Sequence, residues 1–202
     1  MIRSHTFKLS ASDIERKKIF FQFLLMLIAA LVGGICFVKC FEQDISYDIR
    51  SKIINSFSEV SFTDLETTSF LRNVFFSCLP YFCSTLIIFL FSFSYVSYVL
   101  SDIILALNGF FTGILITLVA LCLTPKYFIS AAVFIICTIT SLLILLYFAY
   151  TCALISLGIR LRSSNGRMIF SHKKLLYATV KTFATLGTFI ILILIRSLAL
   201  LF

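Results

Sequence analysis

The sequence has few charged residues, and this scarcity excludes most classes of protein at once. Only 13% of its 202 residues are charged, whereas 60% are hydrophobic and the mean hydropathy is +1.08. Soluble domains contain about 25% charged and about 45–50% apolar residues. The composition therefore excludes a cytosolic enzyme, a secreted disulfide scaffold and a disordered regulator, and it predicts that lipid surrounds most of the chain.

Histidines and recognisable catalytic patterns are scarce as well. The two histidines, His5 and His172, share no zinc-type spacing with any cysteine. The sequence contains no G-x-S-x-G, no H-E-x-x-H, no P-loop and no paired intramembrane carboxylates. We therefore expect no enzyme activity, no catalytic residue, no metal and no cofactor.

The seven cysteines are an odd number, so at least one thiol has no partner within the monomer. Four of them cluster near the ends of the first two expected spans, namely Cys36, Cys40, Cys78 and Cys83. One disulfide among these four is left open. Packing as small apolar side chains is the interpretation that we favour.

Long stretches without charge define the expected membrane spans. They cover residues 19–38, 73–101, 103–125 and 127–159, and a last apolar stretch, 182–202, is interrupted only by Arg196. A helix needs about 20 apolar residues to cross a hydrocarbon core of about 30 Å. The sequence thus predicts an all-α, polytopic transmembrane helical bundle with five spans and one domain.

Lysine and arginine are distributed unevenly between alternate connections. The tail 1–18 and the segment 160–181 together carry 11 of them, and the opposite side carries 5. Because positive residues collect on the cytoplasmic side, we expect the N-terminus inside and the C-terminus outside. The net charge of +8 is therefore interpreted as a record of topology, and we expect the lipid bilayer as partner and no nucleic acid.

The connection 39–72 is the sizeable region that is expected outside. Ile45, Ile49, Ile53 and Phe57 recur every four residues, which predicts a short amphipathic extracytoplasmic helix with one apolar stripe. The interpretation that we favour is that this stripe rests on the outer leaflet or on the bundle itself. The alternative is that it binds an extracytoplasmic partner in a groove.

Three residues stand out within the apolar stretches because they disturb a membrane helix. Pro80 is expected to kink the second span or to end a first segment of it. Asp102 follows Ser101 between the second and third spans, so we expect it to mark their inner turn and to cap the third helix. Arg196 is near the chain end and is expected to snorkel to the outer interface.

Residues 108–113, with the sequence Asn-Gly-Phe-Phe-Thr-Gly, are the most distinctive local motif. Gly109 and Gly113 form a GxxxG face that allows another helix to approach closely, and Asn108 can hydrogen-bond across such a contact. Gly33 and Gly34 in the first span provide a matching surface. Tight helix packing is the favoured interpretation, and a substrate-lining role is the alternative.

The order of these features resembles the stage II sporulation protein M family of endospore-forming bacteria. Ser92, Ser94 and Ser97 stand at the small-residue positions of that family's second span, where glycine is usual. Residues 105–113 match its apolar stretch that ends in a polar residue, a glycine and a second glycine four positions on. Residues 70–73 resemble the Asn-containing start of its second span.

The resemblance implies a non-enzymatic scaffold in the bacterial cytoplasmic membrane. Members of the family anchor or localise cell-wall-remodelling partners during sporulation and engulfment. The implied partners of this chain are therefore peptidoglycan hydrolases, or other membrane or extracytoplasmic proteins.

Two other functional classes stay open on the sequence alone. A small membrane transporter, or the membrane subunit of a transport complex, fits five spans but needs a polar pathway that the apolar stretches hardly provide. A structural helper that stabilises another membrane protein would show the same composition.

Cysteine labelling tests the expected topology. In a variant without native cysteines, Asn165→Cys should resist a membrane-impermeant thiol reagent in intact cells, because residue 165 falls in the basic segment that is expected inside. Asn55→Cys, in the connection expected outside, is the matched control and should react. Labelling of residue 165 in intact cells would contradict this topology.

Overall fold

The computed structural model describes residues 13–41, 67–94, 97–121, 128–162 and 172–199. They form five helices, which are α1 (Asp13–Cys40), α3 (Thr67–Phe91), α4 (Ser97–Leu121), α5 (Phe128–Arg162) and α6 (His172–Ala199). No strand occurs within these ranges, so the described part of the chain is all-helical, as the sequence predicts.

Four of the helices contain stretches that are long and apolar enough to cross a membrane. These stretches are Glu15–Cys40, Ser97–Leu121, Phe128–Leu157 and Leu175–Ser197. Helix α3 has 25 residues, and its described side chains include a shorter apolar stretch, Cys78–Phe91. Four helices thus have the length and composition that a membrane span needs, and the count of five spans stays a prediction.

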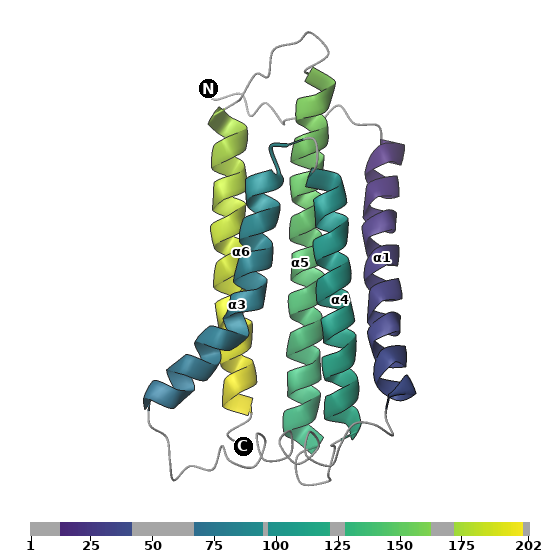
Figure 1. Ribbon diagram of the computed structural model, residues 1–202. Coiled ribbons are helices and arrows are strands. Elements are labelled where there is room, and N and C mark those ends of the chain that lie inside the picture. Colours follow the sequence, from purple (N-terminus) through teal and green to yellow (C-terminus); the bar gives the residue numbers. More distant parts are fainter. Residues whose placement is uncertain (1–12, 42–66, 95–96, 122–127, 163–171, 200–202) are drawn as a thin grey trace.

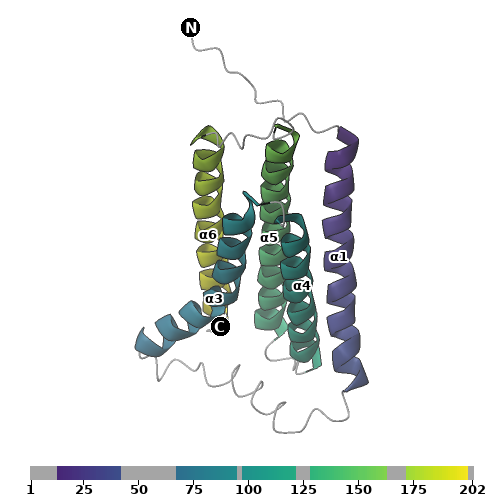
Figure 2. The ribbon, with the colours of Figure 1, turned by 45° about the horizontal axis from the view of Figure 1, so that its top comes forward.

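The helices stand side by side and alternate in direction (Figure 1). In this view α6 and α3 lie to the left, α5 in the middle, and α4 and α1 to the right. The turned view keeps α6 and α1 at opposite flanks (Figure 2). The most extensive contact joins α1 to α4, whereas α5 touches all four other helices. Helix α5 is therefore central, and α1 is held chiefly by α4.

Apolar side chains line both the interior and the outer surface of the bundle. Deeply buried large ones include Phe23, Leu105, Leu142, Leu145, Phe148 and Phe189. Large apolar side chains that face outward include Phe21, Leu90, Ile129 and Phe183, each at least 67% exposed. Such a surface would favour aggregation in water, but lipid tails are as apolar as these side chains. The exposed pattern therefore suits a hydrocarbon environment.

Helix α3 is bent, and its first half turns away from the bundle (Figure 1). Pro80 lies inside this helix. Proline lacks the amide hydrogen that would bond to the carbonyl four residues earlier, and its ring crowds that carbonyl, so a kink is the expected result. Of the two expectations for Pro80, the structure shows the kink, because the helix continues from Thr67 to Phe91.

The connection between α3 and α4 falls inside the stretch 73–101, for which one continuous span was predicted. Helix α3 ends at Phe91 and α4 begins at Ser97. The backbone amide of Ser94 donates to the Phe91 carbonyl, and Ser156 of α5 donates its hydroxyl to the Ser94 carbonyl at 3.0 Å. The predicted boundary at Asp102 is wrong, because α4 already begins five residues earlier, at Ser97.

Candidate functional site

The glycines of α4 lie at its contact with α1. A Cβ atom at Gly113 would come closer than 3.0 Å to the carbonyl oxygen of Leu31, and one at Gly34 would come as close to a backbone oxygen of α4. At Gly109 the distance to a backbone oxygen of α1 would be 3.0 Å. The two backbones can approach this closely only because these residues lack side chains. We call Gly34, Gly109 and Gly113 the glycine joint.

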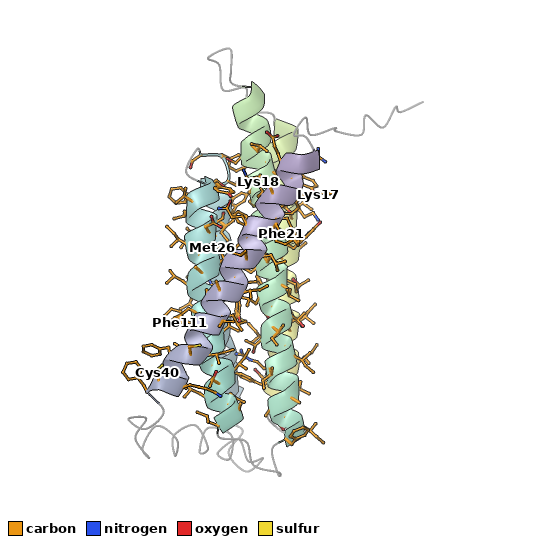
Figure 3. The ribbon with its side chains drawn as sticks, turned by 90° about the vertical axis from the view of Figure 1, so that its right-hand side faces the viewer. Lys17, Lys18, Phe21, Met26, Cys40 and Phe111 are labelled. Carbon is orange, nitrogen blue, oxygen red and sulfur yellow. The ribbon has the colours of Figure 1, made fainter. Side chains whose placement is uncertain are left out.

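Helix α1 lies at the rim of the bundle. Figure 3 shows it crossing obliquely over its neighbours, from Lys17 and Lys18 at one end to Cys40 at the other. Phe21 and Met26 lie on its outward side and are exposed. One face of α1 therefore attaches it to the bundle, and the opposite face is free to contact lipid.

The other two residues of the predicted packing set lie beside the glycine joint. A Cβ atom at Gly33 would be 3.9 Å from the Phe110 ring, which is an ordinary contact. Asn108 reaches α3, where its Nδ2 donates to Oγ of Ser84 at 2.9 Å, and it also donates to the carbonyl of Ile104 in its own helix at 2.8 Å. Helix α4 thus contacts α1 through glycines and α3 through an asparagine.

Asp102 lies inside α4 and not at a helix start, so the predicted cap is wrong. Helix α4 begins at Ser97, which puts Asp102 beyond the free amide groups of the first turn. Asp102 is only 9% exposed, and its Oδ2 accepts a 2.8 Å hydrogen bond from Nε2 of Gln22 on α1. Tyr98 donates its hydroxyl to Oε1 of the same Gln22. We call Gln22, Tyr98 and Asp102 the carboxyl cluster.

Three buried oxygen atoms near the carboxyl cluster have no hydrogen-bond partner in the described part of the chain. They are Oδ1 of Asp102 and the hydroxyl oxygens of Ser97 and Ser101. Many other buried hydroxyls donate to the carbonyl four residues earlier, as Thr117 and Ser141 do. That bond is the usual way to satisfy a hydroxyl in a membrane helix. These three oxygens therefore differ from the other buried side-chain oxygens of the described helices.

Arg196 is half-buried in the last turns of α6. Its Cζ lies 4.8 Å from the centroid of the Phe134 ring, a favourable cation–π geometry. Tyr81, Cys78 and Cys137 lie within its electrostatic reach. The guanidinium thus contacts a ring of α5, and no carboxylate among the described residues pairs with it. Snorkelling to the outer interface stays a prediction.

The described cysteines form no disulfide. Those with free thiols are Cys36, Cys40, Cys78, Cys83, Cys137 and Cys152. Within the described ranges, no group of three or more His, Cys, Asp or Glu residues gathers in a way that could hold a metal ion. Of the four cysteines near the expected outer ends, Cys78 is buried in the core and the other three face outward.

Sequence reasoning missed Gln22, Tyr98 and Ser84 as interhelical residues. Gln22 is the only amide side chain in the stretch 19–38, and this isolation was the available signal, since a polar side chain in a membrane helix usually bonds to another helix. The predicted partner stripe lies outside the described residues; it comprises Ile45, Ile49, Ile53 and Phe57.

Alanine substitutions test the glycine joint. Gly113→Ala and Gly34→Ala should each lower the unfolding temperature in detergent, because forcing a methyl group against a backbone oxygen costs about 1–3 kcal/mol. Gly187→Ala is the matched control, since nothing lies within 4 Å of its added Cβ, and it should leave stability unchanged or slightly raised. Equal stability of all three variants would contradict the close approach.

A double-mutant cycle tests the hydrogen bond between Asn108 and Ser84. Asn108→Ala and Ser84→Ala should couple by about 0.6 kcal/mol in equilibrium unfolding, the average for interhelical hydrogen bonds in membranes. Asn108→Ala combined with Ser156→Ala is the control, because Ser156 bonds elsewhere and their effects should add. Equal coupling in both cycles would argue against a specific bond.

No protein-family model, no curated protein and no solved structure matches the chain. The likeness to the stage II sporulation protein M family therefore rests on residues 70–73, the serines and residues 105–113 alone.

Proposed function

We propose that this chain is a non-enzymatic scaffold that crosses the bacterial cytoplasmic membrane five times and holds an extracytoplasmic partner. Residues 39–72, between the first two spans, supply the contact with that partner. The resemblance given above points to peptidoglycan hydrolases as the partner class, acting while the cell wall is remodelled during sporulation.

The observation that carries this proposal is the wide separation of two helix ends. Helix α1 ends and α3 begins at the same end of the bundle but at opposite flanks, in both views (Figures 1 and 2). Residues 42–66 join these two ends. A connection that is attached on both flanks of a helical bundle is well suited to present a binding surface.

The glycine joint supports the same proposal, because it fixes one of the two attachment points. Close backbone packing between α1 and α4 holds α1 along a large part of its length. Lys39 and Cys40, which lead into the connection, therefore belong to a helix that is firmly attached to the bundle. The bend of α3 directs the other attachment point away from the bundle.

The distribution of basic residues supports an inside location of the N-terminus. The alternating helices bring eight lysines and arginines toward one end, namely Arg16, Lys17, Lys18, Arg160, Arg162, Lys173, Lys174 and Lys181. Toward the other end the described helices carry Lys39, Arg72 and Arg196. Positive residues mark the cytoplasmic side, so the first end is assigned to it.

A second candidate function is that of a small transporter or of the membrane subunit of a transport complex. The observation that favours it is the polar content of the interior, where Asp102 bonds to Gln22 and Asn108 bonds to Ser84. Solute and ion pathways through membrane proteins are lined by polar groups that face the interior of a bundle.

Substitution of the apolar stripe tests the scaffold. Ile49→Ser combined with Ile53→Ser should abolish co-purification of peptidoglycan-degrading activity with the detergent-extracted chain, because each buried isoleucine contributes about 1.5–3 kcal/mol to a helix-in-groove contact. Asp48→Ser with Lys52→Ser, on the other faces of the predicted helix, is the matched control and should retain the activity.

The amount of each variant in the membrane has to be measured in the same cells, so that loss of the partner is not confused with loss of the chain. Undiminished co-purification at normal membrane level would show that the stripe is not the partner surface. A transporter would instead keep its partners in both variants and lose solute flux only where the bundle itself is disturbed.

A further inference from the structure

A half-buried lysine of α6 lies at the junction of α5 and α6. Nζ of Lys181 is 5.2 Å from the centroid of the Tyr147 ring on α5 and 5.9 Å from that of the Tyr177 ring on α6. Both tyrosines are slightly more than half exposed. Attraction between the ammonium group and the two ring faces holds Nζ at this junction. We call Lys181, Tyr147 and Tyr177 the lysine–tyrosine cluster.

No carboxylate among the described residues is placed to pair with Lys181. The acidic residues at the end of the bundle where α6 begins are Asp13 and Glu15 of α1 and Asp102 of α4. Helix α1 lies at the opposite flank from α6 in both views (Figures 1 and 2), and Asp102 accepts its hydrogen bond from α1. The charge of Lys181 therefore has to be balanced from outside the described part of the chain.

The lysine–tyrosine cluster lies at the depth where lipid headgroups begin. Tyr147 follows the start of α5 at Phe128 by 19 residues, about 28 Å along the helix axis, which matches a hydrocarbon core of about 30 Å. One turn further on, Tyr150 contacts the ring of Phe20 on α1 at 5.4 Å between centroids, and Phe20 comes two residues after Lys18. The last basic residue before the apolar part of α1 thus lies near the same level.

We propose that the lysine–tyrosine cluster binds the phosphate group of one anionic phospholipid, in the leaflet at this end of the bundle. The ammonium group of Lys181 donates hydrogen bonds to the phosphate oxygens. The hydroxyls of Tyr147 and Tyr177 donate to them as well, since neither has a hydrogen-bond partner in the described part of the chain. Basic sites between membrane helices are known places of headgroup binding.

The charge of the surroundings favours a lipid with net negative charge over a zwitterionic one. At this end the described helices carry eight lysines and arginines but only three acidic residues. A zwitterionic headgroup would bring a positive group of its own toward this basic end, where like charges repel. An anionic headgroup brings none, so it gains the full attraction.

The surface beyond the cluster suits the acyl chains of such a lipid. Leu143 and Ile136 lie on the same face of α5 as Tyr147, four and eleven residues earlier, and both are at least half exposed. The headgroup contact and the apolar contact therefore continue along one strip of the surface. The site requires only that the chain spans a membrane, so it does not depend on the extracytoplasmic partner proposed above.

A single tryptophan tests the site, because the chain has none of its own. Leu143→Trp places the reporter beside the cluster, and the full chain is reconstituted in vesicles that mix phosphatidylglycerol with phosphatidylcholine. In one series the phosphatidylglycerol carries bromine on its acyl chains, and in the other the phosphatidylcholine does. Bromine quenches only a nearby tryptophan, so the two series give the relative association constant of the two lipids. We expect a preference of about five-fold for phosphatidylglycerol, which corresponds to about 1 kcal/mol.

Three further variants assign the preference to the cluster. In the Leu143→Trp background, Lys181→Gln should abolish it, whereas Lys17→Gln, which removes an exposed lysine of α1 at the same end, should retain it. Tyr147→Phe combined with Tyr177→Phe keeps both rings and removes only the hydroxyls, and the preference should fall at least two-fold. Inorganic phosphate added at constant ionic strength should not displace the lipid.

Equal quenching by the two brominated lipids in Leu143→Trp would overturn the proposal. A preference that persists in Lys181→Gln, or that is unchanged without the two hydroxyls, would overturn it as well. An equal loss in Lys17→Gln would show only a general attraction between the basic end and anionic lipid, and would exclude a specific site. Displacement by inorganic phosphate would identify a free anion, and not a lipid, as the ligand.

Discussion

The close approach of α1 and α4 is the interaction on which the remaining architecture depends. Lipid offers no hydrophobic force that would press two apolar helices together, so their attraction has to come from van der Waals contact and hydrogen bonds at short range. Gly34 and Gly113 make that range accessible, because they remove the side chains that would hold the backbones apart. The hydrogen bond from Gln22 to Asp102 joins the same pair of helices.

Polar side chains inside the bundle form two kinds of hydrogen bond. Most hydroxyls bond to the carbonyl four residues earlier in their own helix, as in Thr138 and Thr182, and these residues add little to the contacts between helices. Among the described residues, Gln22 and Asn108 bond to another helix, and Ser156 of α5 bonds to the connection between α3 and α4. This second group connects α1, α3, α4 and α5 to one another. It therefore contributes more to the arrangement of the helices than the hydroxyls that bond within their own helix.

Hydropathy and residue spacing predicted the helical class, most of the spans and the glycines of α4, because each of these depends on a local pattern. The boundary between α3 and α4 was predicted wrongly because a charged residue is the usual marker of a turn, whereas the chain leaves α3 after Phe91 and buries Asp102. The partner of Asp102 could not be predicted, because Gln22 lies 80 residues away and no pattern in one sequence joins the two. From the sequence, Pro80 could either kink the second span or end a first segment of it, and the continuity of α3 shows that it kinks the helix.

The attachment of α1 to α4 has a consequence for biosynthesis. With 80 residues between Gln22 and Asp102, a ribosome that adds about 5–20 residues per second reaches Asp102 roughly 4–16 s after it has added Gln22. During this delay α1 resides in the bilayer without its principal neighbour, and its amide has no carboxyl group to bond. The broad apolar face of α1, which includes Phe21, Leu25 and Ile28, favours stable insertion of the helix in lipid during this interval.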